Sequence, residues 1–331
     1  VILIIEGKGG TGDNHFWPHM SMIQATTDLE CRGICEINPE APLIDNHFAL
    51  DGVVINKYIV IMEQYNDILD PNQEILSGMI HPIGTFCHEL GHVLGLPDLY
   101  DTSEQSAAGI GEWGLMGSGN WNSQKSPAYM SAWSRYRLGF INPIVVENVI
   151  NAEEIILPAE SGEEGFLAMI LPMDSNIPQE YLILENRQQL GADQYLEKSG
   201  LLVWHIDETI TGMYPAMNSV NVNPDFYGVN LIQADGDGDL YDNCNQCAAD
   251  AGDPFPGDLG ITGLINPSTY SYDRDADGTV EQGGASGISI SNIAADSDGL
   301  ITFTVTNPNS KGEILGYDEG GYDGISYPEN Q

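Results

Sequence analysis

The sequence predicts an α+β protein in which residues 1–142 mix strands with helices and residues 143–307 form a β-rich part. Up to about residue 140, strand-like apolar runs alternate with amphipathic helical segments; beyond it, short β-type runs are separated by Gly, Asp, Asn and Pro. The hydrophobic fraction of 42% is sufficient for a core despite a net charge of -39. Residues 308–331 are rich in Gly, Tyr, Asp and Glu, which indicates a linker or the start of a further module.

The front part contains two predicted strands and two predicted helices. The strands are Val1–Glu6 and Val53–Met62, and the helices are Ile83–Leu94 and Pro127–Leu138. Because Val1 opens the chain inside an apolar run without an initiator Met, we expect this sequence to come from the middle of a longer precursor, which leaves room for a signal peptide before it.

The back part contains seven predicted strands, each a short run rich in branched or aromatic residues. They are Glu154–Leu157, Phe166–Leu171, Tyr181–Glu185, Leu201–Ile206, Gly228–Gln233, Ile288–Ile293 and Leu300–Val305.

The acidic composition excludes two classes of partner. Ten Lys and Arg residues against 49 Asp and Glu residues form no cationic stripe for nucleic acid, and they form no basic patch for an anionic membrane surface. No run of 18 apolar residues exists, so the sequence predicts no membrane span.

Five cysteines allow more than one interpretation. Cys31 with Cys35 and Cys244 with Cys247 are close enough for local disulfides in an oxidising compartment, whereas a zinc ribbon built from all four is the alternative. Cys87 lies within an apolar helical segment, which favours a buried, inert thiol over a nucleophile.

The segment His88-Glu89-Leu90-Gly91-His92 is an HExxH motif. Residues four apart share one face of a helix, so His88 and His92 can bind one zinc ion while Glu89 contacts a water at that metal. Pro82 suits the first turn of this helix. An ordinary buried helix is the alternative interpretation of the pentapeptide alone.

The continuation of the motif favours the zinc site. Gly95 can adopt a positive φ and end the helix, and Pro97 prevents its resumption, so the chain can turn back and present Asp98 to the same metal. Met116 follows between glycines, which is the order expected for a metzincin Met-turn below the metal. A Met that fills a gap in the core is the alternative.

Several segments together resemble the immune inhibitor A-like family of secreted bacterial metallopeptidases. They are FCHELGHVLGLPDLYD (86–101), GEWGLMGSGNW (111–121), SPAYMSAWSRYRLGF (126–140), YLILENRQ (181–188) and GLLVWHIDE (200–208). The resemblance implies a secreted, extracellular zinc endopeptidase that acts on proteins or peptides. It also implies an exported precursor with a propeptide, and a metzincin-like catalytic part joined to a β-rich subdomain. Under this resemblance, we expect the propeptide and the first part of the catalytic domain to precede this sequence.

The residue types also predict a mechanism for peptide hydrolysis. Glu89 would act as general base for a zinc-activated water and then return the proton to the leaving amine. A donor for the oxyanion is also needed, and His205, Tyr129 and Tyr136 are the candidates. For His205, which lies in an apolar run, a structural role is the alternative.

Two acidic loops predict structural calcium sites. Asp235, Asp237, Asp239 and Asp242 alternate with glycines in the first loop, and Asp273, Asp275 and Asp277 precede Gly278 in the second. Alternating carboxylates on a glycine-kinked loop can converge on one calcium ion. Asp253 and Asp258 are possible additions to the first site. Solvated acidic turns are the alternative for both loops.

Two other functions are compatible with these motifs. One is a calcium-stabilised binding or adhesion module whose zinc site is inactive, and the other is a zinc hydrolase that acts on a substrate other than a peptide. The intact set of His88, Glu89, His92, Asp98 and Met116 favours the peptidase over the adhesion module.

Overall fold

The computed structural model describes residues 2–8, 19–22, 43–44, 47–50, 53–54, 57–64, 82–103, 107–123, 126–159, 167–173, 179–213, 218–241, 249–257, 270–274 and 280–310. The chain forms two compact units, Val1–Gly95 and Leu96–Gln331. The fold is sheet-rich with few helices, which agrees with the predicted α+β class. The boundary between these compact units is at Gly95, whereas the amino-acid composition changes near residue 142. The division into residues 1–142 and 143–307 therefore stays a prediction.

The first unit contains a three-stranded sheet in the order β1-β6-β2. Strand β1 (Ile2–Lys8) pairs in parallel with β6 (Lys57–Gln64), and β2 (His19–Met22) pairs antiparallel with β6. The predicted strand Val53–Met62 is divided between two sheets, because β5 (Val53–Val54) pairs with β4 (His47–Leu50), which pairs with β3 (Leu43–Ile44). Helix α1 (Ile83–Leu94) has the predicted bounds.

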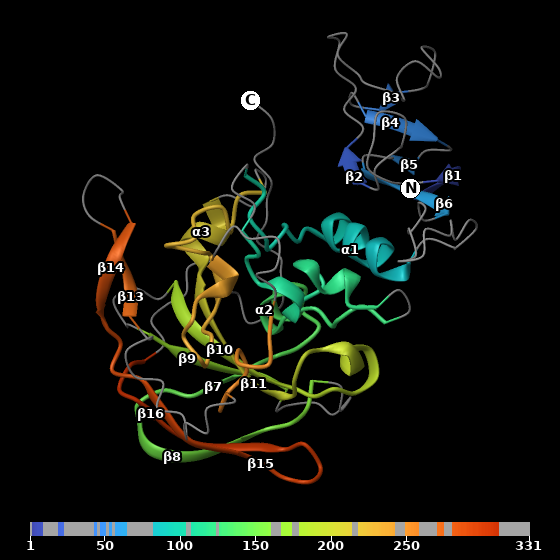
Figure 1. Ribbon diagram of the computed structural model, residues 1–331. Coiled ribbons are helices and arrows are strands. Elements are labelled where there is room, and N and C mark those ends of the chain that lie inside the picture. Colours follow the sequence, from blue (N-terminus) through green and yellow to red (C-terminus); the bar gives the residue numbers. More distant parts are fainter. Residues whose placement is uncertain are drawn as a thin grey trace. The chain divides into compact units, whose positions relative to one another are not determined.

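The second unit is built on a five-stranded sheet in the order β12-β11-β10-β9-β7. A second sheet, β15-β16-β8, lies on one side of it and helix α2 lies on the other (Figure 1). The strands of the first sheet are β7 (Ile144–Val145), β9 (Met169–Pro172), β10 (Glu180–Arg187), β11 (Gly200–Asp207) and β12 (Val229–Leu231). Those of the second are β8 (Val149–Ile156), β15 (Ser289–Ala295) and β16 (Ile301–Asn307).

The remaining elements of the second unit are short. Strands β13 (Tyr270–Arg274) and β14 (Val280–Ala285) pair as an antiparallel ribbon, and α3 (Glu208–Met213) follows β11 directly. The 3₁₀ turns are η1 (Gly111–Trp113), η2 (Ser118–Trp121), η3 (Gly191–Tyr195) and η5 (Asp239–Tyr241). Within the described part of the chain, no helix is long and apolar enough to cross a membrane.

Both faces of the five-stranded sheet are buried. Along β10, Tyr181 and Ile183 belong to one hydrophobic cluster, and Leu182 and Leu184 belong to another. This alternation follows from the two-residue period of a strand, and the second cluster also contains Phe303 and its neighbours on the second sheet. Because each face meets a layer of its own, these strands read as continuous apolar runs rather than alternating ones.

Helix α2 (Ala132–Arg137) is shorter than the predicted helix Pro127–Leu138, so that prediction is wrong at its N-terminal end. The helix begins after Ser131, whose side chain accepts a hydrogen bond from the backbone N of Ser134, as an N-cap does. The preceding segment is held elsewhere, because the backbone N of Tyr129 donates to Asp193 Oδ1 at 2.8 Å.

A buried network of charged side chains lies at the C-terminal end of strand β10, on the same face as Ile183. Arg187 donates through Nε and Nη2 to the two carboxylate oxygens of Asp193, each at 2.5 Å, and through Nη1 to the carbonyl of Trp113 at 2.8 Å. Glu185 accepts hydrogen bonds from Arg135 Nη2 at 2.6 Å and from Trp204 Nε1 at 2.8 Å. The network therefore ties the loop that contains Trp113 to the centre of the sheet.

Candidate metal centre

Helix α1 has the N- and C-terminal signals that the sequence predicts. Pro82 occupies the N-cap position with φ −58°, and Gly95 occupies the C-cap position with φ +104°, in the left-handed region that favours glycine. The backbone N of Gly95 donates to the carbonyl of His92 at 3.0 Å. Lys57 Nζ donates to the carbonyl of Val93 at 2.9 Å, which places a cation at the negative end of the helix. The helix therefore ends at Leu94, two residues after His92, and Gly95 caps it.

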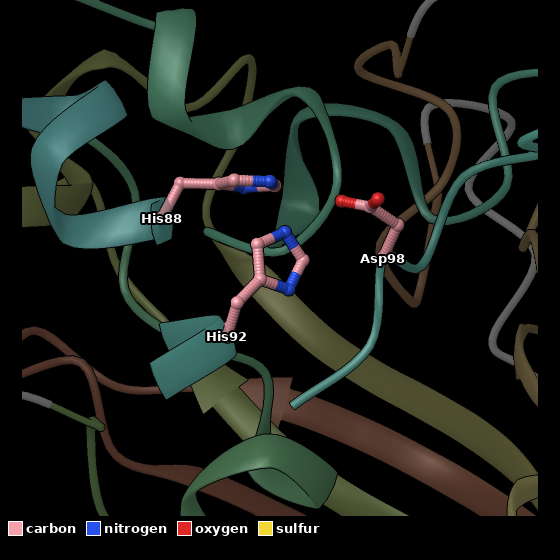
Figure 2. A group of neighbouring side chains, drawn as sticks. All are labelled: His88, His92 and Asp98. Carbon is pink, nitrogen blue, oxygen red and sulfur yellow. The ribbon is translucent and has the colours of Figure 1, made fainter. Parts of the chain in front are cut away.

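The side chains of His88, His92 and Asp98 converge (Figure 2). One ligand atom from each of the three lies within 4.8 Å of the others, and the two imidazole rings are 4.7 Å apart between centroids and nearly perpendicular. Two imidazole nitrogens and one carboxylate oxygen form a donor set that suits zinc, with a fourth position left for water or substrate. These residues therefore fit the metal that the motif predicts.

Glu89 is buried on the same helix, one residue after the first histidine. The carboxyl group of a general base for metal-activated water has to lie beside the metal ligands, and the sequence position of Glu89 meets that requirement.

The segment after Asp98 is bonded to the loop that contains Met116. The backbone N of Leu99 donates to the carbonyl of Met116 at 2.8 Å, and Ile110 N donates to the carbonyl of Leu99 at 2.9 Å. Met116 itself is fully buried in the hydrophobic cluster that contains Trp113 and Trp133. The predicted Met-turn is therefore fastened to the residue next to the third candidate ligand.

The three predicted oxyanion donors have different surroundings. Tyr129 is half-buried, its ring lies 6.0 Å from the guanidinium carbon of Arg135, and its carbonyl accepts from Leu115 N. Tyr136, on α2, packs against the first hydrophobic cluster. His205 is buried on β11, with its Nε2 3.8 Å from a carboxylate oxygen of Glu180 on β10. For His205 the choice between an oxyanion donor and a structural residue therefore stays a prediction.

One residue at this site has no signal in the sequence. Asn218 Nδ2 donates to Oδ2 of Asp98, and the backbone N of Asp98 donates to Oδ1 of Asn218 at 2.6 Å. The two residues are 120 positions apart. Asn218 belongs to no periodic pattern or motif, so nothing local in the sequence pointed to it.

The first acidic loop forms a cluster with a different composition from the predicted one. Ligand atoms of Asp235, Asp237 and Asp250 lie within 4.8 Å of one another. Asp250 was absent from the predicted set, whereas the predicted Asp242 and Asp258 lie outside the described residues. A Cβ on Gly252 would come 1.8 Å from Asp235 Oδ2, so only glycine permits this close approach.

Two further carboxylates border this cluster. Asp253 is almost completely buried, and its Oδ2 accepts from Trp113 Nε1 at 2.7 Å and from Asp250 N at 3.0 Å. Within the described residues, its other oxygen has no hydrogen-bond partner. Burial raises the pKa of Asp253 to about 7 and the pKa of Asp239 to about 6, and the neighbouring carboxylates add to both shifts. The ionised cluster is therefore costly unless a cation neutralises it.

The second acidic loop is described only in part. Asp273 lies in β13, and its backbone position pairs with Glu281 of β14. Asp275 and Asp277 lie outside the described residues, as do Cys31, Cys35, Cys244 and Cys247. Cys87 is half-buried on α1, and burial raises the pKa of its thiol, which keeps the thiol protonated and unreactive.

A helix with two histidines, followed by a turn that presents an aspartate, brings together three groups that could hold a metal ion, an arrangement that metal-dependent hydrolases use. Residues 68–144 match the family model described as immune inhibitor A peptidase M6, catalytic domain. This segment contains α1, Asp98 and Met116, and the match confirms the family resemblance that the sequence motifs predict.

Two curated relatives support the same class. Both are described as pre-pro-metalloprotease PrtV, from two strains of Vibrio cholerae serotype O1. Each is 29% identical to this chain over 99 residues, an alignment that covers 29% of this chain and 10% of the relative. Since the chain spans only a small part of the relatives' length, the similarity indicates a metallopeptidase and leaves substrates and partners to be proposed.

Proposed function

We propose that this chain is the catalytic part of a zinc-dependent endopeptidase. The observation that carries the proposal is the convergence of His88, His92 and Asp98 inside the segment that matches a metallopeptidase family. The intervening Glu89 supplies the group that peptide hydrolysis needs and that a purely structural metal site lacks.

In this proposal, His88, His92 and Asp98 would hold zinc, which when bound would supply the Lewis acidity that polarises a carbonyl and lowers the pKa of a water toward about 7. Glu89 accepts the proton from the water as its oxygen attacks the carbonyl carbon, and then delivers that proton to the leaving amine nitrogen as the peptide bond breaks. Glu89 thus ends the cycle ionised, as it began. Asp98 and the two histidines hold their positions throughout.

The proposed fold is metzincin-like, with Met116 in the turn below the metal. The burial of Met116 and the hydrogen bond from Leu99 N to its carbonyl support this role, because that turn is bonded to the neighbour of Asp98. Residues 143–307 form the β-rich subdomain in the same proposal.

Metal removal tests the proposed activity. We expect the purified chain to cleave a quenched fluorogenic peptide library, 1,10-phenanthroline to abolish the cleavage, and a stoichiometric amount of zinc to restore it. A folded, zinc-loaded chain that cleaves no peptide would contradict the endopeptidase and favour the adhesion module or a hydrolase with another substrate class. The nonchelating 1,7-phenanthroline is the matched control.

We also propose that the cluster of Asp235, Asp237 and Asp250 binds a structural calcium ion, with Asp239 and Asp253 at its border. Oδ1 of Asp253 is buried and has no hydrogen-bond partner among the described residues, which supports this site because a cation would satisfy such an oxygen. The segment that carries Asp250 is hydrogen-bonded to the loop before Met116. Trp113 Nε1 donates to Asp253, and Ala249 N donates to Glu112 Oε2 at 2.9 Å.

Calcium should therefore raise the thermal stability of the chain. At free calcium 100-fold above the dissociation constant, a single site stabilises the folded state by about 2.7 kcal/mol. We expect calorimetry to show a higher melting temperature in calcium than in EGTA, and Asp235→Asn to remove the difference. Asp225→Asn, which changes an exposed acid elsewhere in the unit, is the control and should keep it. Equal melting in calcium and EGTA would rule out the site.

We further propose that the protein is secreted and made with an inhibitory propeptide. The family resemblance supports export, and the printed description of the relatives as pre-pro-metalloproteases supports a propeptide. The strongly acidic composition supports the view that neither nucleic acid nor an anionic membrane surface is a partner.

A further inference from the structure

The third candidate ligand, Asp98, is held by a reciprocal pair of hydrogen bonds with Asn218. The Asp98 backbone N–H can only donate, so it fixes Oδ1 of Asn218 toward itself, at 2.6 Å. The amide nitrogen of Asn218 is then directed at Oδ2 of the Asp98 carboxylate, to which it donates. The oxygen and nitrogen of the Asn218 amide have nearly the same shape, so the chemistry of their partners identifies which is which.

The segment that carries Asn218 is itself anchored at several points. Thr102 Oγ1 donates to the carbonyl of Asn218 at 2.7 Å, and the backbone of Asn218 has φ +53°, a conformation that asparagine tolerates better than most residues. Three residues on, the fully buried Asn221 donates to the carbonyl of Leu99 at 3.0 Å and to that of Val229 at 2.8 Å. The segment therefore joins the chain that follows Asp98 to strand β12.

The left-handed backbone conformation of Asn218 does not by itself explain why its side chain contacts Asp98. Asn292 has the same φ of +53°, but it is exposed, and its amide donates to the hydroxyl of Thr304 on a neighbouring strand. The amide of Asn218 instead contacts the carboxylate of a candidate metal ligand. Because the amide is neutral, it leaves the negative charge of the Asp98 carboxylate available to a metal cation. A lysine or arginine at this position would instead neutralise that charge.

We propose that Asn218 is a positioning residue for the metal centre: its amide holds Oδ2 of Asp98 so that Oδ1 is directed toward His88 and His92. This inference rests on the proposed zinc site and extends it to a residue outside the motif. Carboxylates that bind metals are themselves commonly hydrogen-bonded, and loss of such a partner typically lowers metal affinity by about 10- to 100-fold. Fixing the carboxylate before the metal arrives reduces the conformational entropy that binding has to remove.

The test measures metal binding without substrate, in the full chain. Asn218→Gly keeps the tolerance for positive φ and removes the amide, so we expect the zinc dissociation constant, measured by competition with a chromogenic chelator, to rise about 10- to 100-fold. Asn218→Asp keeps the acceptor for Asp98 N–H and removes the donor, and a comparable loss is expected. In both variants the visible absorption of the cobalt-substituted protein should shift in position or intensity.

Asn292→Gly is the matched control, because it makes the same change at the same φ on an exposed part of strand β15. It should leave zinc affinity and the cobalt spectrum unchanged, and the metal-free form of each variant should melt close to its wild-type value. Unchanged zinc affinity in Asn218→Gly, or wild-type affinity in Asn218→Asp, overturns the positioning role. So does a zinc loss that the control shares.

These outcomes are separable from failure of the proposed function. A wild-type chain that binds zinc and cleaves no peptide contradicts the peptidase, while the affinities of the variants still decide the role of Asn218. A chain in which wild type and variants bind zinc equally contradicts only the role of Asn218, and a wild-type chain that binds no zinc overturns both.

Discussion

Glu89→Gln should leave zinc bound and reduce peptide turnover by about 10²–10⁴-fold or more, the range attributed to general acid–base catalysis. Glutamine has nearly the shape of glutamate but cannot accept a proton from the attacking water. Because Glu89 is buried and flanks the first ligand without belonging to the convergent set, its loss should affect the chemical step rather than the metal site. The measurements are kcat on a fluorogenic peptide and zinc content by elemental analysis.

The control for this experiment is Glu153→Gln, which makes the same chemical change at an exposed position on β8. It should keep wild-type turnover. A zinc-loaded Glu89→Gln protein that retains near wild-type kcat would remove Glu89 from the mechanism, whereas a variant that loses its zinc would show that Glu89 has a structural role at the metal.

Arg187→Met should lower the free energy of unfolding by about 3–5 kcal/mol, the typical effect of removing one partner from a buried ion pair. Its guanidinium is fully buried, and its loss would leave the Asp193 carboxylate without its two closest donors and the Trp113 carbonyl without its donor. Burying an uncompensated charge is costly, since no water replaces the lost hydrogen bonds. Urea unfolding followed by intrinsic fluorescence measures the change.

The control is Arg137→Met, whose guanidinium lies 3.5 Å from a carboxylate oxygen of Glu208 and is partly exposed. This pair has one long contact and keeps 17% of the Arg137 side chain exposed, against 0% for Arg187, so we expect a smaller loss than for Arg187→Met. Losses of equal size in the two variants would show that burial does not set the strength of these ion pairs. Arg187→Met and Asp193→Leu combined should recover part of the stability, because the second change removes the unpaired charge.

The sequence predicted the elements whose signals are local. Helix α1 was predicted with its observed bounds, because Pro82, the apolar face and Gly95 are neighbours along the chain. The strands β10 and β11 were predicted within two residues at each end, since they are buried on both faces and consist of uninterrupted apolar runs. Helix α2 was predicted too long, because contacts with Asp193 on a distant turn hold the segment before Ser131 outside the helix.

The parts of the site that were missed depend on contacts between distant residues. Asp250 lies with Asp235 and Asp237 in one acidic cluster, and Asn218 meets Asp98 across 120 positions. Neither contact leaves a periodic pattern, so the sequence shows the alternating aspartates of one loop, with Asp253 as a possible addition, but not Asp250 beside them.

The sequence by itself determined the candidate donor set of the proposed metal centre, because His88, His92 and Asp98 lie within eleven consecutive residues whose geometry follows from one helix and one glycine turn. Only the tertiary structure decided what surrounds that donor set. Asn218 reaches Asp98 from 120 residues away, and Arg187 fastens the loop before Met116 to the sheet. The physical reason is that helix geometry is fixed by hydrogen bonds between near neighbours, whereas the partners of a buried carboxylate are chosen by how the whole chain packs.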